Sequence, residues 1–163
     1  MNRTIKMTAL TTVVALTGIF MLGMHTSDAA DGKATIEQRR ALMKSISKDF
    51  KPIKAFVKSG KGSAADVAKH AKAINASTGK VLALFPKGTG RGDFSDKETR
   101  ALPAIWKDWA GFEKANKALA DESAKLASIA GGGDQKAIAK QVGVMGKLGC
   151  GGCHKPFRGA KAK

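Results

Sequence analysis

Apolar residues recur at alternating three- and four-residue steps in four stretches of the chain, and none of the stretches shows the alternation of a convincing β-strand. The first stretch covers about residues 35–59 and ends before Gly60 and Gly62. Its predicted inward face consists of Ile36, Arg39, Met43, Ile46, Phe50, Ile53 and Val57. This spacing is typical of one seam of a bundled helix. Pro52 lies inside the stretch and predicts a kink or a local loosening.

The second stretch covers about residues 63–85. Ser63 and Asp66 have the spacing of a capping arrangement at its start, and Pro86 ends it. Its predicted inward face consists of Val67, Ala71, Ile74, Thr78, Val81 and Phe85. A glycine-rich connection then runs to about Thr99, and it is the longest link of the predicted domain.

The third stretch begins near Pro103, a residue that suits the first turn of a helix. Its predicted inward face consists of Ile105, Trp109, Phe112, Asn116, Leu119, Ser123 and Leu126. The fourth stretch runs from about Gln135 towards Arg158, with apolar positions that include Ile138, Val142, Met145 and Leu148. Four amphipathic helices joined mostly by short links predict an all-α fold, an antiparallel four-helix bundle.

The N-terminus has a different pattern. Arg3 and Lys6 precede an uncharged apolar run over residues 7–24, and the small-x-small sequence 27–29 follows it. A basic start, an apolar run and a small-residue site predict a secretory signal peptide over residues 1–29, cleaved near Ala29. The alternative is a retained anchor, because about 18 apolar residues can span a bilayer. We expect cleavage, which leaves residues 30–163 as one exported domain without stable membrane insertion.

The whole chain has 29 basic and 13 acidic side chains and a net charge of +16. Removal of the signal peptide takes away two basic residues and one acidic residue, which leaves +15. A strong positive field steers association with acidic partners. The lysines are spread along the chain without a compact basic block, and export from the cytoplasm separates the protein from nucleic acid, so we expect no nucleic-acid partner.

Both cysteines lie in one short motif near the C-terminus, Cys150-Gly-Gly-Cys153-His154. The string C-x-x-C-H is the attachment signature of c-type haem. A two-residue spacer on a helical turn lets two thiols reach the two vinyl groups on one edge of the porphyrin. The next residue, His154, then supplies the proximal nitrogen to the iron. The motif therefore predicts one covalent haem c, and the two glycines leave room for the ring.

Three other interpretations of the motif remain open. A zinc site needs four ligands, and beyond the motif the exported chain offers only one further histidine, His70. A thioredoxin-like dithiol belongs at a helix start in a strand-rich fold, whereas this motif lies near the end of a helical chain. A structural disulfide across two glycines is the third. Haem attachment takes place outside the cytoplasm and agrees with the signal peptide, so we favour it.

From about residue 35 to 158 the chain resembles the class II cytochromes c, the cytochrome c-prime group. The resemblance lies in the C-terminal motif Leu148-Gly-Cys-Gly-Gly-Cys-His-Lys-Pro-Phe-Arg158 and in the opening Ile36-Glu-Gln-Arg39-Arg-Ala-Leu-Met43. Two further similar segments are Leu84-Phe-Pro86 and Ala104-Ile-Trp-Lys107. The resemblance implies an antiparallel four-helix bundle, commonly dimeric through its first two helices.

The resemblance also implies roles for three more residues. Arg39 would face a haem propionate, Met43 would lie over the distal face of the iron, and Arg158 would line the proximal side. The inward position of Arg39 supports its role independently, because a buried charge is costly unless it is paired. The alternatives are that Arg39 reaches the surface while Arg40 faces out, and that Met43 only fills the core.

Met43 decides between two functional hypotheses. If it ligates the iron, the protein is a six-coordinate electron carrier between redox partners, and this is the interpretation we adopt from the sequence. If it does not, the protein is a five-coordinate cytochrome c-prime that binds nitric oxide or carbon monoxide. The sequence shows no second chemical constellation, so we do not expect an enzyme. His70 is expected at the surface, and Trp109 and Phe112 are expected in the core.

Overall fold

The computed structural model describes residues 26–162. Six α-helices form most of it: α1 (Thr26–Ser59), α2 (Ala64–Thr78), α3 (Ala104–Lys107), α4 (Trp109–Gly131), α5 (Gln135–Val144) and α6 (Gly151–Phe157). A short 3₁₀ turn, η1 (Leu82–Leu84), follows α2, and a π-helical segment, η2 (Met145–Cys150), joins α5 to α6. Residues 1–25, which make up most of the predicted signal peptide, lie outside the described part.

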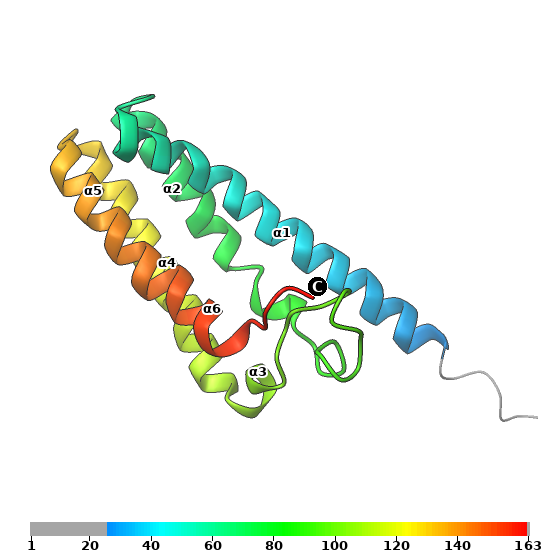
Figure 1. Ribbon diagram of the computed structural model, residues 1–163. Coiled ribbons are helices and arrows are strands. Elements are labelled where there is room, and N and C mark those ends of the chain that lie inside the picture. The colour runs from blue at the N-terminus through cyan, green and yellow to red at the C-terminus, as the bar shows by residue number, and fades with distance from the viewer. Residues whose placement is uncertain (1–25, 163) are drawn as a thin grey trace, which may run out of the picture.

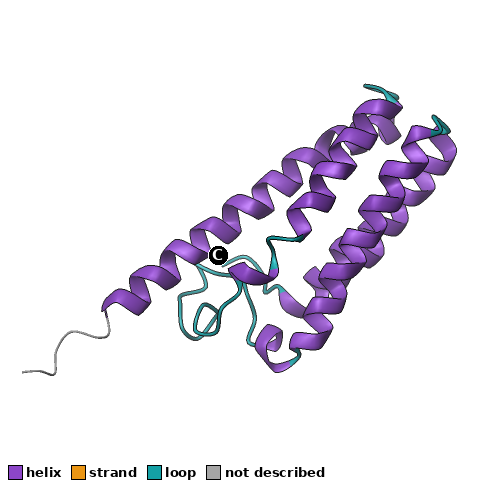
Figure 2. Ribbon diagram, turned by 180° about the vertical axis from the view of Figure 1, so that it is seen from behind, coloured by secondary structure: helices purple, strands orange, loops and turns teal. Residues whose placement is uncertain are grey.

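The four long rods of the bundle run side by side (Figure 1). Helix α2 packs against both α1 and α4, and α5 contacts both α4 and α1, so the bundle closes on itself. Helices α5 and α6 with η2 between them form one rod that returns along α4. The loop between η1 and α3 gathers at one end of the bundle, beside the C-terminus (Figure 2). The predicted four-helix architecture is confirmed.

Most of the predicted inward positions are indeed inward. In α2 every predicted residue from Val67 to Thr78 is buried, and Phe112, Ser123 and Leu126 are buried in α4. At the start of α2, the side chain of Ser63 accepts a hydrogen bond from the Asp66 amide at 3.1 Å. The Ser63 amide donates in return to the Asp66 carboxylate, so the predicted cap is a full capping box.

Helix α1 begins nine residues earlier than the sequence pattern predicts, at Thr26 instead of about Thr35. Part of this extension is held by the η1–α3 loop, because Gly32 is buried against Phe94. A Cβ atom at Gly32 would lie 2.9 Å from the Phe94 ring. The periodicity could not show this contact, since the partner lies sixty residues away in a loop. The helix runs through Pro52 without a break.

The third predicted helix is divided into α3 and α4. Asp108 leaves helical geometry between them, and its carboxylate accepts a hydrogen bond from the Gly111 amide at 3.0 Å. Asp108 is therefore an N-cap, a role for which aspartate is well suited. The sequence interpretation treated it as an ordinary helical position.

The prediction that Leu148 faces the core is wrong. Its side chain is 48% exposed, the only large hydrophobic residue so exposed within residues 26–162, while the next residue, Gly149, is buried. The π-helical geometry of η2 explains the difference, because it advances fewer degrees per residue than an α-helix and shifts the face that looks inward. A Cβ atom at Gly149 would lie 3.0 Å from the Cα of Leu119, so glycine lets η2 approach α4 closely.

The core consists of two clusters at different ends of the bundle. The first contains mainly aliphatic residues of α1, α2, α4, α5 and η2: Ile53, Phe56, Val67, Ala71, Ile74, Leu126, Ala127, Ala130, Ile138, Val142 and Met145. The second, which we call the aromatic cluster, contains Val81, Phe85, Ala101, Ile105, Phe112, Ala115 and Phe157. Trp106 and Trp109 pack against it. The aromatic cluster lies at the end that carries the η1–α3 loop and α6.

Within residues 26–162, none of the helices combines the length and the apolar character that crossing a bilayer requires. The signal-peptide prediction concerns residues that lie almost entirely outside this range. It therefore stays a prediction, together with the cleavage near Ala29.

Replacing Leu126 with Ala should lower the free energy of unfolding by about 2–5 kcal/mol, because the side chain is fully buried in the aliphatic cluster. Urea unfolding of the Leu126→Ala variant measures this loss. Ser128→Ala on the exposed face of α4 is the matched control and should change the value by less than about 0.5 kcal/mol. Equal stability of the two variants would show that the aliphatic cluster is not packed as described.

Candidate haem site

The C-x-x-C-H motif lies where η2 passes into α6. Cys150 is the last residue of η2, and Cys153 and His154 lie in the first turns of α6. Both cysteines are free and half-buried, so the structure does not contain the disulfide alternative. A Cβ atom at Gly152 would meet nothing within 4 Å, so that face of the turn is open. The helical turn that the sequence predicts for the motif is present.

The residues proposed for the site converge on the aromatic cluster. Cys153 and Met43 both pack against it, although they are separated by more than a hundred residues. The guanidinium of Arg39 lies 4.5 Å from the ring centre of Phe85, a member of the cluster. Phe112 is the centre of the cluster, with ring centroids 4.7 Å from Phe85 and 5.4 Å from Phe157.

Burial raises the pKa of both thiols. The pKa of Cys153 rises to about 11, mainly through burial and further through the neighbouring Cys150. The pKa of Cys150 is also raised by burial. A reactive dithiol needs a lowered thiol pKa, which favours the thiolate. The environment therefore opposes the thioredoxin-like interpretation.

The zinc interpretation also finds no support. Within residues 26–162, no three side chains among His, Cys, Asp and Glu gather as a group that could hold a metal ion. His70 lies in α2, where its Nδ1 is 3.0 Å from the carboxylate of Asp49. We expected it at the surface, and it is partly exposed there; this carboxylate, not the motif, is its partner.

Positive charge surrounds His154. His154 is exposed to solvent on one side. Protein atoms around the rest of the imidazole ring exclude water from it, and this lowers its pKa. The guanidinium groups of Arg158 and Arg100 lower it further. A neutral imidazole has a free lone pair, which is the form that ligates a metal. The prediction that Arg158 lines the proximal side stays a prediction, and its effect on the pKa of His154 supports it.

Arg39 is buried, with only 5% of its surface exposed, while Arg40 faces solvent. Its guanidinium donates hydrogen bonds to the carbonyl oxygen of Leu84, to both oxygens of Thr89 and to Oγ1 of Thr99, at 2.8–3.3 Å. Burial lowers its pKa to about 10. The alternative in which Arg39 reaches the surface is therefore wrong.

All of these acceptors are neutral, so the charge of Arg39 is solvated but not neutralised. Among residues 26–162 no carboxylate forms an ion pair with it. A buried cation is stabilised strongly by an anion within a few ångströms. The prediction that Arg39 faces a haem propionate stays a prediction, and the missing counter-charge supports it.

The sequence interpretation missed the residues that organise the η1–α3 loop. On one side the loop is hydrogen-bonded to α1 through Thr89 and Thr99. On the other side it is hydrogen-bonded to the C-terminal tail through Arg91 and Arg100. No periodicity marks loop residues, so only the high glycine content of the segment pointed to a special conformation. Trp106 belongs here too, since its indole N–H donates to the Phe85 carbonyl oxygen at 2.9 Å and its ring covers Gly90.

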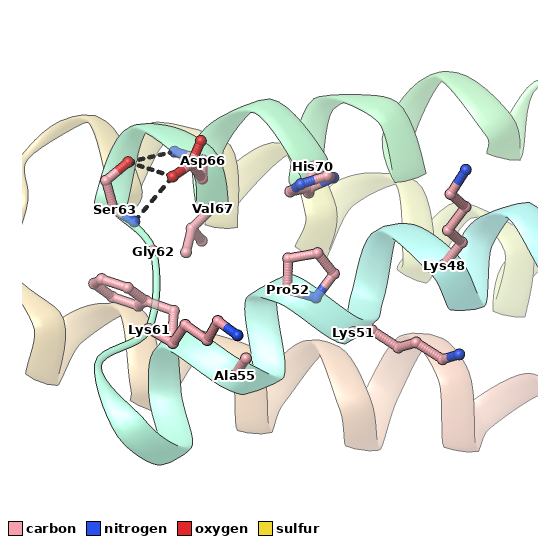
Figure 3. A pocket seen from close by; sticks show the side chains of 11 residues that line it. Lys48, Lys51, Pro52, Ala55, Lys61, Gly62, Ser63, Asp66, Val67 and His70 are labelled. Carbon is pink, nitrogen blue, oxygen red and sulfur yellow. Dashed lines mark hydrogen bonds between the residues drawn. The ribbon is translucent and has the colours of Figure 1, made fainter.

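A surface cavity lies elsewhere in the described residues. It has a volume of about 490 Å³ and lies between the C-terminal half of α1 and the start of α2, with Pro52, Ala55, Phe56 and Val67 among its walls (Figure 3). His70 faces it across from Pro52 (Figure 3). None of its residues belongs to the aromatic cluster or to the motif, so we do not assign it to the haem.

The arrangement fits a covalent haem in three respects. Two free thiols lie one turn apart beside an open glycine face, a histidine follows directly, and a large apolar cluster lies beside them. A model of one family, described as Cytochrome C', matches residues 34–158. The chain belongs to the cytochrome c' family. As a member of this family it carries a covalently attached c-type haem with iron.

Individual cytochromes c' show the same relation. The cytochrome c' of Rhodospirillum rubrum is 35% identical over 132 residues, which cover 81% of this chain and 86% of that protein. The solved cytochrome c' of Shewanella frigidimarina is 31% identical with a TM-score of 0.69, and the match covers 79% of this chain and 97% of the other. A third cytochrome c', described as having a ligand-controlled dimer dissociation, is 26% identical with a TM-score of 0.69, over 79% and 97% of the two chains.

Replacing His154 with Ala should remove the proximal ligand and change the visible spectrum, while the haem stays attached through Cys150 and Cys153. Absorption spectra of the ferric and ferrous protein measure the change. The control is His70→Ala, whose spectrum should match that of the wild type because His70 is paired with Asp49. An unaltered spectrum in the His154 variant would show that another residue ligates the iron.

Proposed function

We propose that this protein is a five-coordinate cytochrome c' that binds nitric oxide or carbon monoxide at its haem iron in the periplasm. The observation that carries the proposal is the composition of the aromatic cluster. Apart from Cys153, Met43 and the Arg39 guanidinium over Phe85, the side chains that form it or pack against it are alanines, aliphatic residues and aromatic rings. Apart from the Met43 thioether, such surroundings offer no strong sixth ligand from the protein, and an apolar environment suits a small uncharged gas.

Three residues hold the cofactor in this proposal. Cys150 and Cys153 bind the porphyrin edge through thioether bonds, and the imidazole of His154 ligates the iron. When bound, the haem supplies a redox-active iron that takes up a small diatomic ligand. The three side chains lie within five consecutive residues of one helical segment, so the helix constrains their positions relative to one another.

In the proposal Arg39 also takes part in haem binding, because its positive charge would balance the charge of a haem propionate. Its hydrogen bonds to Thr89 and Thr99 hold the guanidinium in one orientation, so little side-chain entropy remains to be lost on binding an anion. In the proposal Arg158 lines the proximal side, with Arg100 nearby. Burial lowers the pKa of the His154 imidazole and the charges of Arg158 and Arg100 lower it further, which favours the neutral form that ligates iron.

Among the side chains of residues 26–162 that pack against the cluster, Met43 carries the thioether that could act as a sixth ligand. It is half-buried on the inward face of α1, and its thioether could fill space next to Leu42 or bind the iron. Our sequence interpretation adopted the second role and an electron-carrier function. The family relation and the apolar cluster favour the first role, and the relative with ligand-controlled dimer dissociation supports a ligand-responsive iron.

Electron transfer remains the second candidate function. The net charge of +16 over the full chain favours acidic redox partners, through long-range attraction that weakens with salt.

We also propose that the protein forms a homodimer through α1 and α2, in line with the relative that is described as a dimer. We propose further that it is not an enzyme. Export with cleavage near Ala29 completes the proposal.

Replacing Met43 with Leu decides between the two functions. If Met43 only packs, ferric wild type and Met43→Leu should both be high-spin, and both ferrous proteins should bind carbon monoxide. The absorption spectrum with and without carbon monoxide measures this. Met145→Leu is the matched control, since Met145 is fully buried in the aliphatic cluster.

A low-spin wild type that becomes high-spin only in the Met43 variant would contradict the proposal. That result would establish methionine ligation and the electron-carrier function. The Met145 variant should keep the wild-type spectrum under either hypothesis, because Met145 belongs to the aliphatic cluster and not to the aromatic cluster beside the haem motif.

A further inference from the structure

The chain segment that follows His154 is fastened to the η1–α3 loop. Arg100 and Gly159 bind each other in both directions: the Gly159 amide donates to the Arg100 carbonyl oxygen at 2.8 Å, and the Nε of Arg100 donates to the Gly159 carbonyl oxygen at 2.8 Å. The amide of Leu102 donates to the Phe157 carbonyl oxygen at 3.1 Å. The tail after α6 thus pairs with residues 100–102 like a short antiparallel strand.

Arg91 fastens the same tail from the other side. One of its terminal nitrogens donates to the Ala160 carbonyl oxygen, and its Nε lies 3.1 Å from the Asp96 carboxylate. The guanidinium of Arg91 occupies the space that a Cβ atom at Gly159 would need. Glycine at position 159 is therefore a condition for this contact.

The loop is itself anchored to α1. Arg39 donates to Thr99 at 2.9 Å, directly before Arg100 in the chain, and Arg91 donates to the carbonyl oxygen of the same threonine at 3.3 Å. A continuous path of hydrogen bonds therefore runs from α1, through the loop, to the tail behind His154. Helix α6 is the C-terminal end of the rod formed by α5, η2 and α6, and the last turn of a helix lacks intrahelical partners for its carbonyl groups.

We propose that Arg100 is a positioning residue for the proximal ligand: by clamping Gly159 it fixes the end of α6 and so the orientation of the His154 imidazole. The inference rests on the assignment of His154 as the iron ligand. At the end of the helix the Arg158 amide donates to the His154 carbonyl oxygen at 3.2 Å, and the Leu102 amide donates to the carbonyl oxygen of the last helical residue, Phe157, at 3.1 Å. Without the side-chain bond from Arg100 to Gly159 we expect this end to fray more readily and the imidazole plane to lose its fixed angle.

The test compares Arg100→Ala, Arg100→Lys and Lys97→Ala in the haem-loaded protein. Lys97 is exposed on the same loop, so its variant removes an equal charge without touching the clamp. Three quantities are measured: hydrogen exchange of the Gly159 amide, the iron–histidine stretching band of the ferrous protein by resonance Raman, and the reduction potential. Both Arg100 variants keep the backbone carbonyl that accepts from the Gly159 amide and lose only the side-chain bond to the Gly159 carbonyl oxygen. Loss of that one bond should make opening of the pair easier, so the amide should exchange roughly fivefold faster.

The iron–histidine band should shift and broaden in both Arg100 variants, and their reduction potentials should shift from the wild-type value. Lysine keeps the charge but cannot place a donor where Nε of arginine lies, so Arg100→Lys should follow Arg100→Ala. Lys97→Ala should match the wild type in band and exchange. Leu126→Ala, which lowers stability elsewhere, should leave the band in place and so separates positioning from general destabilisation.

Gly159→Ala keeps the inference testable if Arg100→Ala fails to fold. This variant should shift the band as well, because its Cβ atom displaces Arg91. An unchanged band in the Arg100 variants despite faster exchange at Gly159 would overturn the inference, and so would unchanged exchange. If instead His154→Ala retained the band, the assignment of the ligand itself would be wrong, which is a different failure.

Discussion

The structure depends on one constraint: the helical turn with Cys150, Cys153 and His154 must lie against a large apolar surface. A c-type haem has a flat hydrophobic ring, and its attachment through two thiols is useful only if that ring is shielded from water. The aromatic cluster around Phe112 provides this surface at the end of the bundle where α6 ends. The other end is filled mainly by aliphatic side chains, whose burial stabilises the bundle.

The charge of Arg39 near the site is held by burial and hydrogen bonds, and within residues 26–162 it is not balanced by an ion pair. Arg39 is buried and hydrogen-bonded only to neutral oxygens, and its lowered pKa reports the cost of that position. Buried cations are rarely retained without an anion. On the other side of the site, Arg100 and Arg158 act on His154 through space. The η1–α3 loop connects both sides, because it holds Arg39 through Thr99 and the tail through Arg100.

The periodic part of the fold could be predicted from the sequence, since helix faces follow from spacing alone. Arg39 was expected on an inward face and is buried, and the seam of α2 is as predicted. The motif by itself predicts the haem, because the chemistry of attachment is local to five residues. The pattern failed at Leu148, where π-helical geometry changes the phase, and at the loop, where Thr99 and Arg100 act through tertiary contacts that no spacing encodes. The spin state of the iron cannot be predicted from the helix pattern or from the haem motif, since Met43 can pack against the cluster or ligate the iron from the same position.

The most direct test of the account is the intact mass and colour of the exported protein, made where the haem attachment machinery is active and then denatured. The account predicts a red protein whose chain, measured after denaturation, is heavier by the mass of one haem. The Cys150→Ala, Cys153→Ala double variant should lose this added mass. A colourless chain of unmodified mass under the same conditions would contradict the central claim.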